Sequence, residues 1–292
     1  MYEHAALILL YAEEPVHPGA GGGIGAIDLP VQREVHTNLP IMYGSGLKGS
    51  LKARMKSAFT ESAQFEALFG KEEETTGVED HNSALSFTDA NLLAFPVKAA
   101  SGLFAWLTSP RQLTLFNTVR QHAGLPALPL PANWPGDEQC LTPPGYGHEA
   151  ILEHFCFTRL ADHAVATALA PVVFPEAGWH REHFTRALLI VSDDTFEYFT
   201  TKSTEIRTRV RIDDATGVVA DGALWIEEYL PVDTILFASV LAARPSRPEC
   251  GVADAQAALT LFSTHCPALA QFGGNETVGK GFMRLIPVTE AH

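Results

Sequence analysis

The sequence predicts an α+β fold in which both ends of the chain contribute to one core. Residues 4–11 are an apolar run with the length of a buried strand, and an amphipathic segment at 45–59 and a β-forming segment at 85–97 follow it. Near the other end, the order strand, helix, strand recurs at residues 231–244, 252–266 and 282–288. This order fits a ferredoxin-like or RRM-like palm with insertions, and the alternating segment 208–224 predicts a projecting β-hairpin.

Length and composition favour a soluble globular protein. The 292 residues can build one elaborated domain or two small ones, and 46% of them are hydrophobic, with a mean hydropathy of +0.05. No run reaches the roughly 18 apolar residues that a membrane span needs, and the first residues include acids instead of a basic leader, so we expect a cytoplasmic protein. The cysteines form no CxxC pair, which indicates neither a zinc knuckle nor a disulfide framework (Cys140, Cys156, Cys250 and Cys266).

The net charge of −14 argues against a nucleic-acid partner and, taken alone, favours a small-molecule enzyme. Positive charge is nevertheless concentrated locally. Four bases and no acid lie between Lys48 and Lys56, and arginines alternate at positions 207, 209 and 211. A protein that is packed between neighbours and grips a polyanion locally needs only such local basicity.

Residues 16–59 combine a glycine-rich turn, a lone carboxylate and a basic helix. The glycines permit close approach of the backbone to a bulky anion (Gly19, Gly21, Gly22, Gly23, Gly25 and Gly44). A dinucleotide-binding fingerprint would open a helix directly on the glycines, whereas here the extended segment IDLPVQREV intervenes, so we exclude a Rossmann site.

The basic helix has two parallel stripes. Ser45 is the predicted N-cap, and the core stripe consists of Leu47, Leu51, Met55 and Phe59. One position further on, a row of ammonium groups follows the same spacing (Lys48, Lys52 and Lys56). Together with the helix N-terminus, this row predicts a track for a polyanion; a solvated lysine face is the alternative.

The middle of the chain predicts a helix at 62–69, strands at 150–157 and 186–192, and helices that start at Pro110 and Asp193, the first capped by Ser109. Residues 71–82 are an acidic loop insertion, and the proline-rich residues 125–146 predict an irregular surface insertion in preference to a domain linker. His180 and His183 have a spacing that could offer two metal ligands, but no third ligand lies nearby, which disfavours a metal there.

Two further segments have phosphate-binding character. The arginines of the predicted hairpin, Arg207, Arg209 and Arg211, could contact a phosphate backbone, or they could protect an edge strand from aggregation. The glycine-rich segment GGNETVGKG contains one base, and its residues Gly279, Lys280 and Gly281 predict a backbone nest for phosphate, with a simple tight turn as the alternative.

These segments resemble a known family. HPGAGGGIGAIDLPVQREVHT, GSGLKGSLK and GGNETVGKGFMRL are similar to the RAMP superfamily of CRISPR proteins. IDLPVQRE and RTRVRIDDATGVVADGALWIEEYLP resemble, more narrowly, the repeated backbone subunit of type III-B (Cmr) effector complexes, the fourth-named of their RAMP proteins. The resemblance implies a single RAMP domain over residues 1–292, with a palm built from the N- and C-terminal parts and a thumb at 201–230 that presses on a guide RNA.

The resemblance also implies a function and a site. It predicts a subunit that binds crRNA, stacks with other copies of itself and with other Cmr subunits, and cleaves complementary target RNA with a divalent ion, Mg²⁺ or Mn²⁺. Asp28 would orient or activate the attacking 2′-hydroxyl to leave a cyclic phosphate, since a free carboxylate with a pKa near ~3.9 is a weak base by itself. His17 would contact RNA or donate to the phosphate, and Glu228 would help to hold the metal, although Glu227 and Glu228 could instead pair with Arg207 or Arg209. The predicted RNA contacts are Ser45, Lys48, Lys52, Lys56, Arg207, Arg209, Arg211, Gly279, Lys280 and Gly281.

Three other functions stay open at this point. The same scaffold could serve assembly without cleavage, or act as a stand-alone nuclease that cuts CRISPR precursor RNA as a monomer. A small-molecule hydrolase would require a deep closed pocket in place of an open groove. The sequence contains no visible Ser-His-Asp grouping or two-metal carboxylate cluster.

Overall fold

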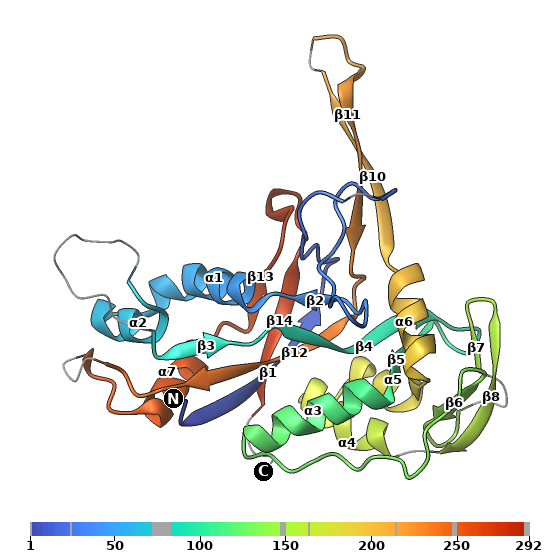
Figure 1. Ribbon diagram of the computed structural model, residues 1–292, viewed down its shortest axis with the longest axis horizontal. Helices are drawn as coiled ribbons and strands as arrows, with labels where there is room; N and C mark the ends of the chain where they lie inside the picture. Colours follow the sequence, from blue (N-terminus) through green and yellow to red (C-terminus); the bar gives the residue numbers. More distant parts are fainter. Residues whose placement is uncertain are drawn as a thin grey trace.

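The computed structural model describes residues 2–23, 25–71, 83–146, 150–162, 164–213, 215–246 and 250–288 (Figure 1). Apart from Lys71, the predicted acidic insertion at 71–82 lies outside these residues. The fold is a mixed α+β arrangement around one large mixed sheet, as the sequence predicts.

The central strand of this sheet is β1 (His4–Ala12), which pairs antiparallel with β12 (Ile235–Ala242) on one side and β14 (Phe282–Val288) on the other. The N- and C-terminal parts of the chain therefore form adjacent strands. From Leu7 onward β1 is buried on both faces, with Ile8 and Leu10 in one core cluster and Leu7 and Leu9 in a second, whereas His4 at its start is exposed.

The remaining strands extend the sheet in the order β13-β14-β1-β12-β4-β5-β9-β6-β8-β7. Most neighbours are antiparallel, whereas the pairs β5–β9 and β6–β8 are parallel. The short strands β2 and β3 pair with β4 and β12 respectively. The bounds are β2 Ile41–Met42, β3 Leu85–Phe87, β4 Ala90–Lys98, β5 Phe104–Thr108, β6 Gln139–Thr142, β7 Ala150–Leu152, β8 Phe155–Asp162, β9 Leu188–Ile190 and β13 Leu269–Gln271.

Helices cover both faces of the sheet (Figure 1). The first core cluster takes side chains from α1 (Gly44–Met55), α2 (Ser62–Phe69), α6 (Asp193–Lys202) and α7 (Ala255–His265). The second takes side chains from α3 (Pro110–His122), α4 (Val165–Val173) and α5 (Trp179–Ala187). No helix among the described residues is long and apolar enough to cross a membrane.

Several local predictions were wrong. The N-cap of α1 is Tyr43, and Ser45 lies in the first turn, because the helix already begins at Gly44, whose N–H donates to the Asp89 carboxylate at 2.7 Å. Residues 150–157 form the hairpin β7–β8 instead of one strand, since Glu153 turns the chain with a φ of 52°. The segment 125–146 is not wholly irregular, because β6 lies within it, and the sequence analysis did not predict α4.

The predicted hairpin is present as a separate two-stranded sheet of β10 (Glu205–Ile212) and β11 (Val219–Tyr229), which projects from the body (Figure 1). Arg207, Arg209 and Arg211 alternate along β10 with apolar residues, of which Ile206 and Val210 are about half exposed at 52% and 46%. A bulge interrupts the ladder between Val210 and Ile212, so that Arg211 occupies the irregular position.

Candidate functional site

Three segments meet at the base of the hairpin: the glycine-rich segment after β1, the end of β11, and the second glycine loop before β14. Val16 and Leu230 exchange two backbone hydrogen bonds of 2.9 and 2.8 Å. Gly274 N–H donates to the carbonyl of His17 at 2.9 Å, and Gly281 N–H donates to the carbonyl of Pro15 at 2.9 Å. The two glycine loops, far apart in the sequence, therefore lie side by side.

A pocket of about 490 Å³ lies where these loops face α1. Glycines at several of its positions leave the backbone open, and a Cβ at Gly21 or Gly46 would meet nothing within 4 Å. Its lining consists of His17, Pro18, Gly19, Gly21, Leu29, Gln32, Met42, Gly46, Ser50, Gly273 and Gly274. The pocket is lined by exposed backbone in place of charged side chains. Such a lining suits a nucleic-acid strand that approaches with its sugar–phosphate edge.

His17 is the polar side chain at the centre of this junction. It is only 6% exposed, and its Nδ1 lies 2.7 Å from the carbonyl oxygen of Glu228. Because a carbonyl can only accept, Nδ1 carries the proton and Nε2 is the acceptor in the neutral ring. Gly19 must be glycine here, since a Cβ would lie 2.8 Å from Nε2.

Asp28 is exposed and lies beside the base of β11. Its Oδ2 accepts the N–H of Ile226 at 2.8 Å, and its carbonyl accepts the N–H of Gly23 at 2.7 Å. The following residue, Leu29, donates to Ile226 and accepts from Glu228, both at 3.0 Å. The carboxylate therefore faces solvent at the hairpin base, and Leu29, not Asp28 itself, lines the pocket.

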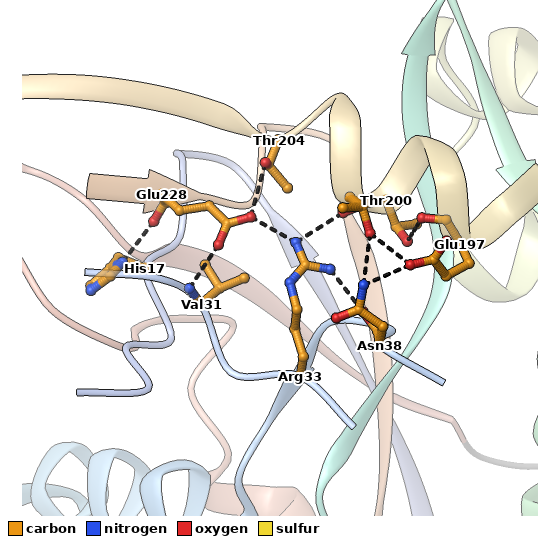
Figure 2. A network of polar contacts seen from close by, with 9 residues as sticks. His17, Val31, Arg33, Asn38, Glu197, Thr200, Thr204 and Glu228 are labelled. Atoms are coloured by element: carbon orange, nitrogen blue, oxygen red, sulfur yellow. Dashed lines mark hydrogen bonds and ion pairs between the residues drawn. The ribbon is translucent and has the colours of Figure 1, made fainter. Parts of the chain in front are cut away.

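Glu228 has a different environment (Figure 2). It is 3% exposed, its Oε2 accepts the N–H of Val31 at 3.0 Å, and its Oε1 accepts from Arg33 at 2.6 Å and from Thr204 at 3.0 Å. Both oxygens accept from protein donors, which supports a structural role, and the metal-binding role of Glu228 stays a prediction. Sequence reasoning missed Arg33, because nothing near it in the sequence indicates a partner 195 positions away.

Glu227 has a structural role, which the sequence left open as the alternative to metal binding. It accepts from Trp225 Nε1 at 2.7 Å, from Asn275 Nδ2 at 3.1 Å and from the hydroxyl of Tyr229, and Arg209 Nε lies 3.7 Å away. Burial raises the pKa of Glu227, but the hydrogen bonds from Tyr229 and Trp225 and the charge of Arg209 outweigh burial, so the net pKa is lowered. The carboxylate thus joins the hairpin base to the second glycine loop through Asn275.

Some of the predicted RNA contacts are exposed, and others already pair or bond with protein groups. On the hairpin, Arg207 pairs with Glu205 at 2.5 Å and stacks over the ring of Tyr229, Arg209 lies against Glu227, and Arg211 is exposed. In the second glycine loop, Gly279 is exposed, whereas Lys280 Nζ lies 3.5 Å from Glu14.

Gly281 has a packing role. It is buried, and a Cβ there would lie 2.1 Å from the carbonyl oxygen of Phe272. Its N–H, which the sequence analysis assigned to a phosphate nest, donates to Pro15 instead. This geometry gives Gly281 a structural role, and its contact with RNA stays a prediction.

The lysine row of α1 is also largely occupied. Lys48 Nζ donates to the carbonyl of Leu85 at 2.9 Å and to Ser83 Oγ at 2.7 Å, while Lys52 Nζ donates to the carbonyls of Gly70 and Lys71. Burial, and then the charge of Lys52, lower the pKa of Lys48. Two of the ammonium groups brace α1 against β3 and the end of α2, and the polyanion track stays a prediction; Lys56 and Ser45 are exposed.

The two histidines of α5 pack against neighbouring side chains. His183 Nε2 lies 3.0 Å from the carbonyl oxygen of Phe104, and the ring stacks on Trp179 at 4.7 Å. Within the described ranges, no group of three or more His, Cys, Asp or Glu residues is placed to hold a metal ion.

Residues 9–284 match the family model of the RAMP superfamily. This chain belongs to the RAMP superfamily. It is 32% identical over 291 residues to the "CRISPR system Cmr endoribonuclease Cmr4" of Pyrococcus furiosus, which covers 96% of this chain and 95% of that protein. It is 25% identical to the "CRISPR system CMR subunit Cmr4" of Saccharolobus solfataricus, over 89% of this chain and 88% of that protein.

Solved structures of RAMP proteins resemble the fold throughout. Oligomeric Cmr4 from Pyrococcus furiosus has a TM-score of 0.74 at 26% identity and covers 98% of both chains. A chain of the type III-B Cmr-beta complex bound to cognate target RNA has a TM-score of 0.75 at 23% identity, also over 98% of both chains, and this likeness concerns the fold.

Proposed function

We propose that this RAMP protein is the repeated backbone subunit of a type III-B CRISPR ribonucleoprotein in the cytoplasm. It binds guide crRNA, stacks with other copies of itself and with other Cmr subunits, and cleaves complementary target RNA. The observation that carries the proposal is an exposed Asp28 carboxylate beside the glycine-lined junction, in a chain that is similar over almost its whole length to a protein named an endoribonuclease.

In this proposal the chain is one RAMP domain. The adjacent strands β14, β1 and β12, with α1 and α7, correspond to the ferredoxin-like palm, and the hairpin β10–β11 is the thumb. The RNA backbone lies against the two glycine loops, where Gly279 is exposed. Ser45 at the start of α1, Lys56 just after α1 and Arg211 at the bulge of the hairpin are the exposed residues along its further path. Base pairing to the guide supplies the sequence specificity, and the protein supplies shape and backbone contacts.

The chemistry assigned to Asp28 is attack of the target's own 2′-hydroxyl on the adjacent phosphate. The free oxygen of Asp28 orients this hydroxyl and accepts its proton, while the hydrogen bond from Ile226 fixes the other oxygen. The 5′-oxygen leaves and takes a proton from water, and a cyclic phosphate remains. His17 Nδ1 donates to the carbonyl of Glu228, so Nε2 donates to the phosphate only when the ring is the imidazolium, which carries a proton on both nitrogens.

A divalent ion, Mg²⁺ or Mn²⁺, fits this donor set only if RNA phosphates and water supply most of its ligands. Asp28 offers one free carboxylate oxygen, and Mg²⁺ is commonly held by one or two carboxylates together with substrate phosphates. When bound, such an ion would neutralise charge on the phosphate and favour ionisation of the 2′-hydroxyl.

The test is Asp28→Asn in the complex reconstituted with guide RNA. We expect cleavage of a labelled target to fall by roughly 10²-fold or more, because a positioned base contributes about 10²–10⁴-fold, while guide binding and co-assembly stay unchanged. Unchanged cleavage would refute the assignment of this chemistry to Asp28.

A second candidate is the same scaffold without cleavage. The observation that favours it is the sparse donor set at Asp28: no group of three or more His, Cys, Asp or Glu among the described residues is placed to hold a metal ion, and the Glu228 carboxylate accepts from protein donors. An unsubstituted complex that binds target RNA tightly, yet leaves it intact with Mg²⁺ or Mn²⁺, would select this candidate.

A further inference from the structure

Glu228 is the residue through which both proposed catalytic side chains are held. Its backbone carbonyl accepts from His17 Nδ1 at 2.7 Å, and its backbone N–H donates to the carbonyl of Leu29, the neighbour of Asp28, at 3.0 Å. Its side chain accepts from Val31 and Arg33 (Figure 2). One residue of β11 therefore contacts the segments of His17 and Asp28 with its N–H, its C=O and its carboxylate.

The segment around Asp28 runs as a short parallel strand beside β11. Leu29 bonds with Ile226 and Glu228 through its backbone, and the Asp28 carboxylate accepts the N–H of Ile226. Beyond Leu29 the next inward N–H, that of Val31, is met by the Glu228 side chain. The carboxylate thus fixes the register of the segment, and a shift of one residue would turn Asp28 to the opposite face.

Arg33 compensates the charge of the buried Glu228 carboxylate and connects it to neighbouring segments of the fold. The side chains of Arg33 and Glu228 are 16% and 4% exposed, and Arg33 also donates to the carbonyls of Asn38 at 2.8 Å and Thr200 at 3.1 Å. Thr200 lies on α6, immediately before the hairpin. Loss of either partner would leave an uncompensated buried charge.

We infer that Glu228 and Arg33 are a positioning pair that sets the register of the Asp28 segment and the orientation of His17, and that Glu228 does not ligate the metal. The catalytic roles of Asp28 and His17 rest on the proposed function, whereas the register of the Asp28 segment does not. It follows that Asp28 is carried by the hairpin base, so that a hairpin held by RNA also holds the acid in place.

The first experiment measures register without activity. In the purified full-length chain, we expect Glu228→Gln to increase amide hydrogen exchange of residues 26–33 by at least about tenfold, because the charged partner of Arg33 and the best acceptor for Val31 are lost. Thr204→Val, which removes one hydrogen bond to Oε1, gives a smaller increase and covers the case in which Glu228→Gln does not fold. Glu13→Gln, which breaks an ion pair with Arg284 outside the junction, is the matched control and leaves this segment unchanged.

The second experiment uses the reconstituted complex. Glu228→Gln should lower cleavage about 10²-fold, the scale of a misplacement near 1 Å, with unchanged guide binding and with no larger rise in the half-saturating Mg²⁺ concentration than Arg33→Gln produces. The double variant Arg33→Gln/Glu228→Gln should be less impaired than the product of the two single effects, because the pair is removed together.

The outcomes separate the two proposals. A half-saturating Mg²⁺ concentration raised more by Glu228→Gln than by Arg33→Gln would make Glu228 a ligand and overturn the inference, as would exchange in residues 26–33 that none of the Glu228 and Thr204 variants changes. If the unsubstituted complex does not cleave, the proposed function fails, and the exchange result still decides whether the pair sets the register.

Discussion

Asp28 and Glu228 are both acids at the base of the hairpin, yet their surroundings give them opposite roles. Asp28 is exposed and has one oxygen bonded to a backbone N–H, so its other oxygen is available to a substrate. Glu228 is buried, and donors from Val31, Arg33 and Thr204 occupy its carboxylate. A carboxylate that already satisfies buried donors stabilises the fold, and removing it leaves those donors unpaired.

The glycines of the second loop differ in the same way. Gly279 and Gly281 both have positive φ, at 73° and 83°, but only Gly281 is packed against backbone, the carbonyl of Phe272. Position 279 therefore requires glycine only because of its positive φ. Position 281 requires glycine because of its positive φ and because no space is left for a Cβ.

We expect Gly281→Ala to lower the free energy of unfolding by about 3 kcal/mol or more, because steric overlap adds to the strained φ. Gly279→Ala, the matched control, should cost only about 1–2 kcal/mol. Urea denaturation of both variants measures the difference. Equal losses would show that Gly281 is not packed as described.

At the scale of elements, the hairpin is anchored at its base and open towards its tip. Glu227 and Tyr229 bond with Asn275 of the second glycine loop, and Arg207 and Arg209 lie against acids near the same end. Arg211 lies further out, at the bulge, and is exposed. The arginines therefore form a gradient. Those near the base of the hairpin pair with acids of the protein, and the one further out is available to a ligand.

This gradient predicts that Arg211→Ala weakens RNA binding by the complex and reduces the slope of log affinity against log salt by about 1, because one phosphate contact is lost. Thr208→Ala, an exposed substitution on the opposite face of β10, is the control and should change neither quantity. Filter binding at several salt concentrations tests this. An unaltered slope in Arg211→Ala would remove the hairpin tip from the RNA interface.

At the scale of the whole molecule, the net charge of −14 is compatible with RNA binding only through local chemistry. Exposed backbone at the glycine loops and a few exposed cations replace a broad basic face. Such a subunit binds RNA weakly when alone and gains affinity when many copies line one strand.

We therefore expect the protein purified from its host to carry a small RNA of uniform length and sister proteins, and to elute far above its own 31.6 kDa. Size-exclusion chromatography with light scattering, followed by RNA sequencing, measures this. A nucleic-acid-free monomer that cuts free RNA would instead support the stand-alone processing nuclease.

The sequence by itself determined the elements that depend on local pattern. The apolar run of β1, the Pro110 start of α3, the alternation of the hairpin and the glycine loops follow from periodicity and backbone freedom, and the motifs in these loops identified the family. Its assignments of Lys48, Lys52, Gly281 and Glu228 to ligands stay predictions, and in the structure each of these residues has a partner within the fold that is distant in sequence or hidden by packing.

Only the tertiary structure decided which charged groups remain free. The contact between Arg33 and Glu228 spans 195 positions, and the approach of Gly274 to His17 joins the two ends of the chain. A residue type fixes what a side chain can bind, but its partners and its exposure arise when the sheet brings distant segments together.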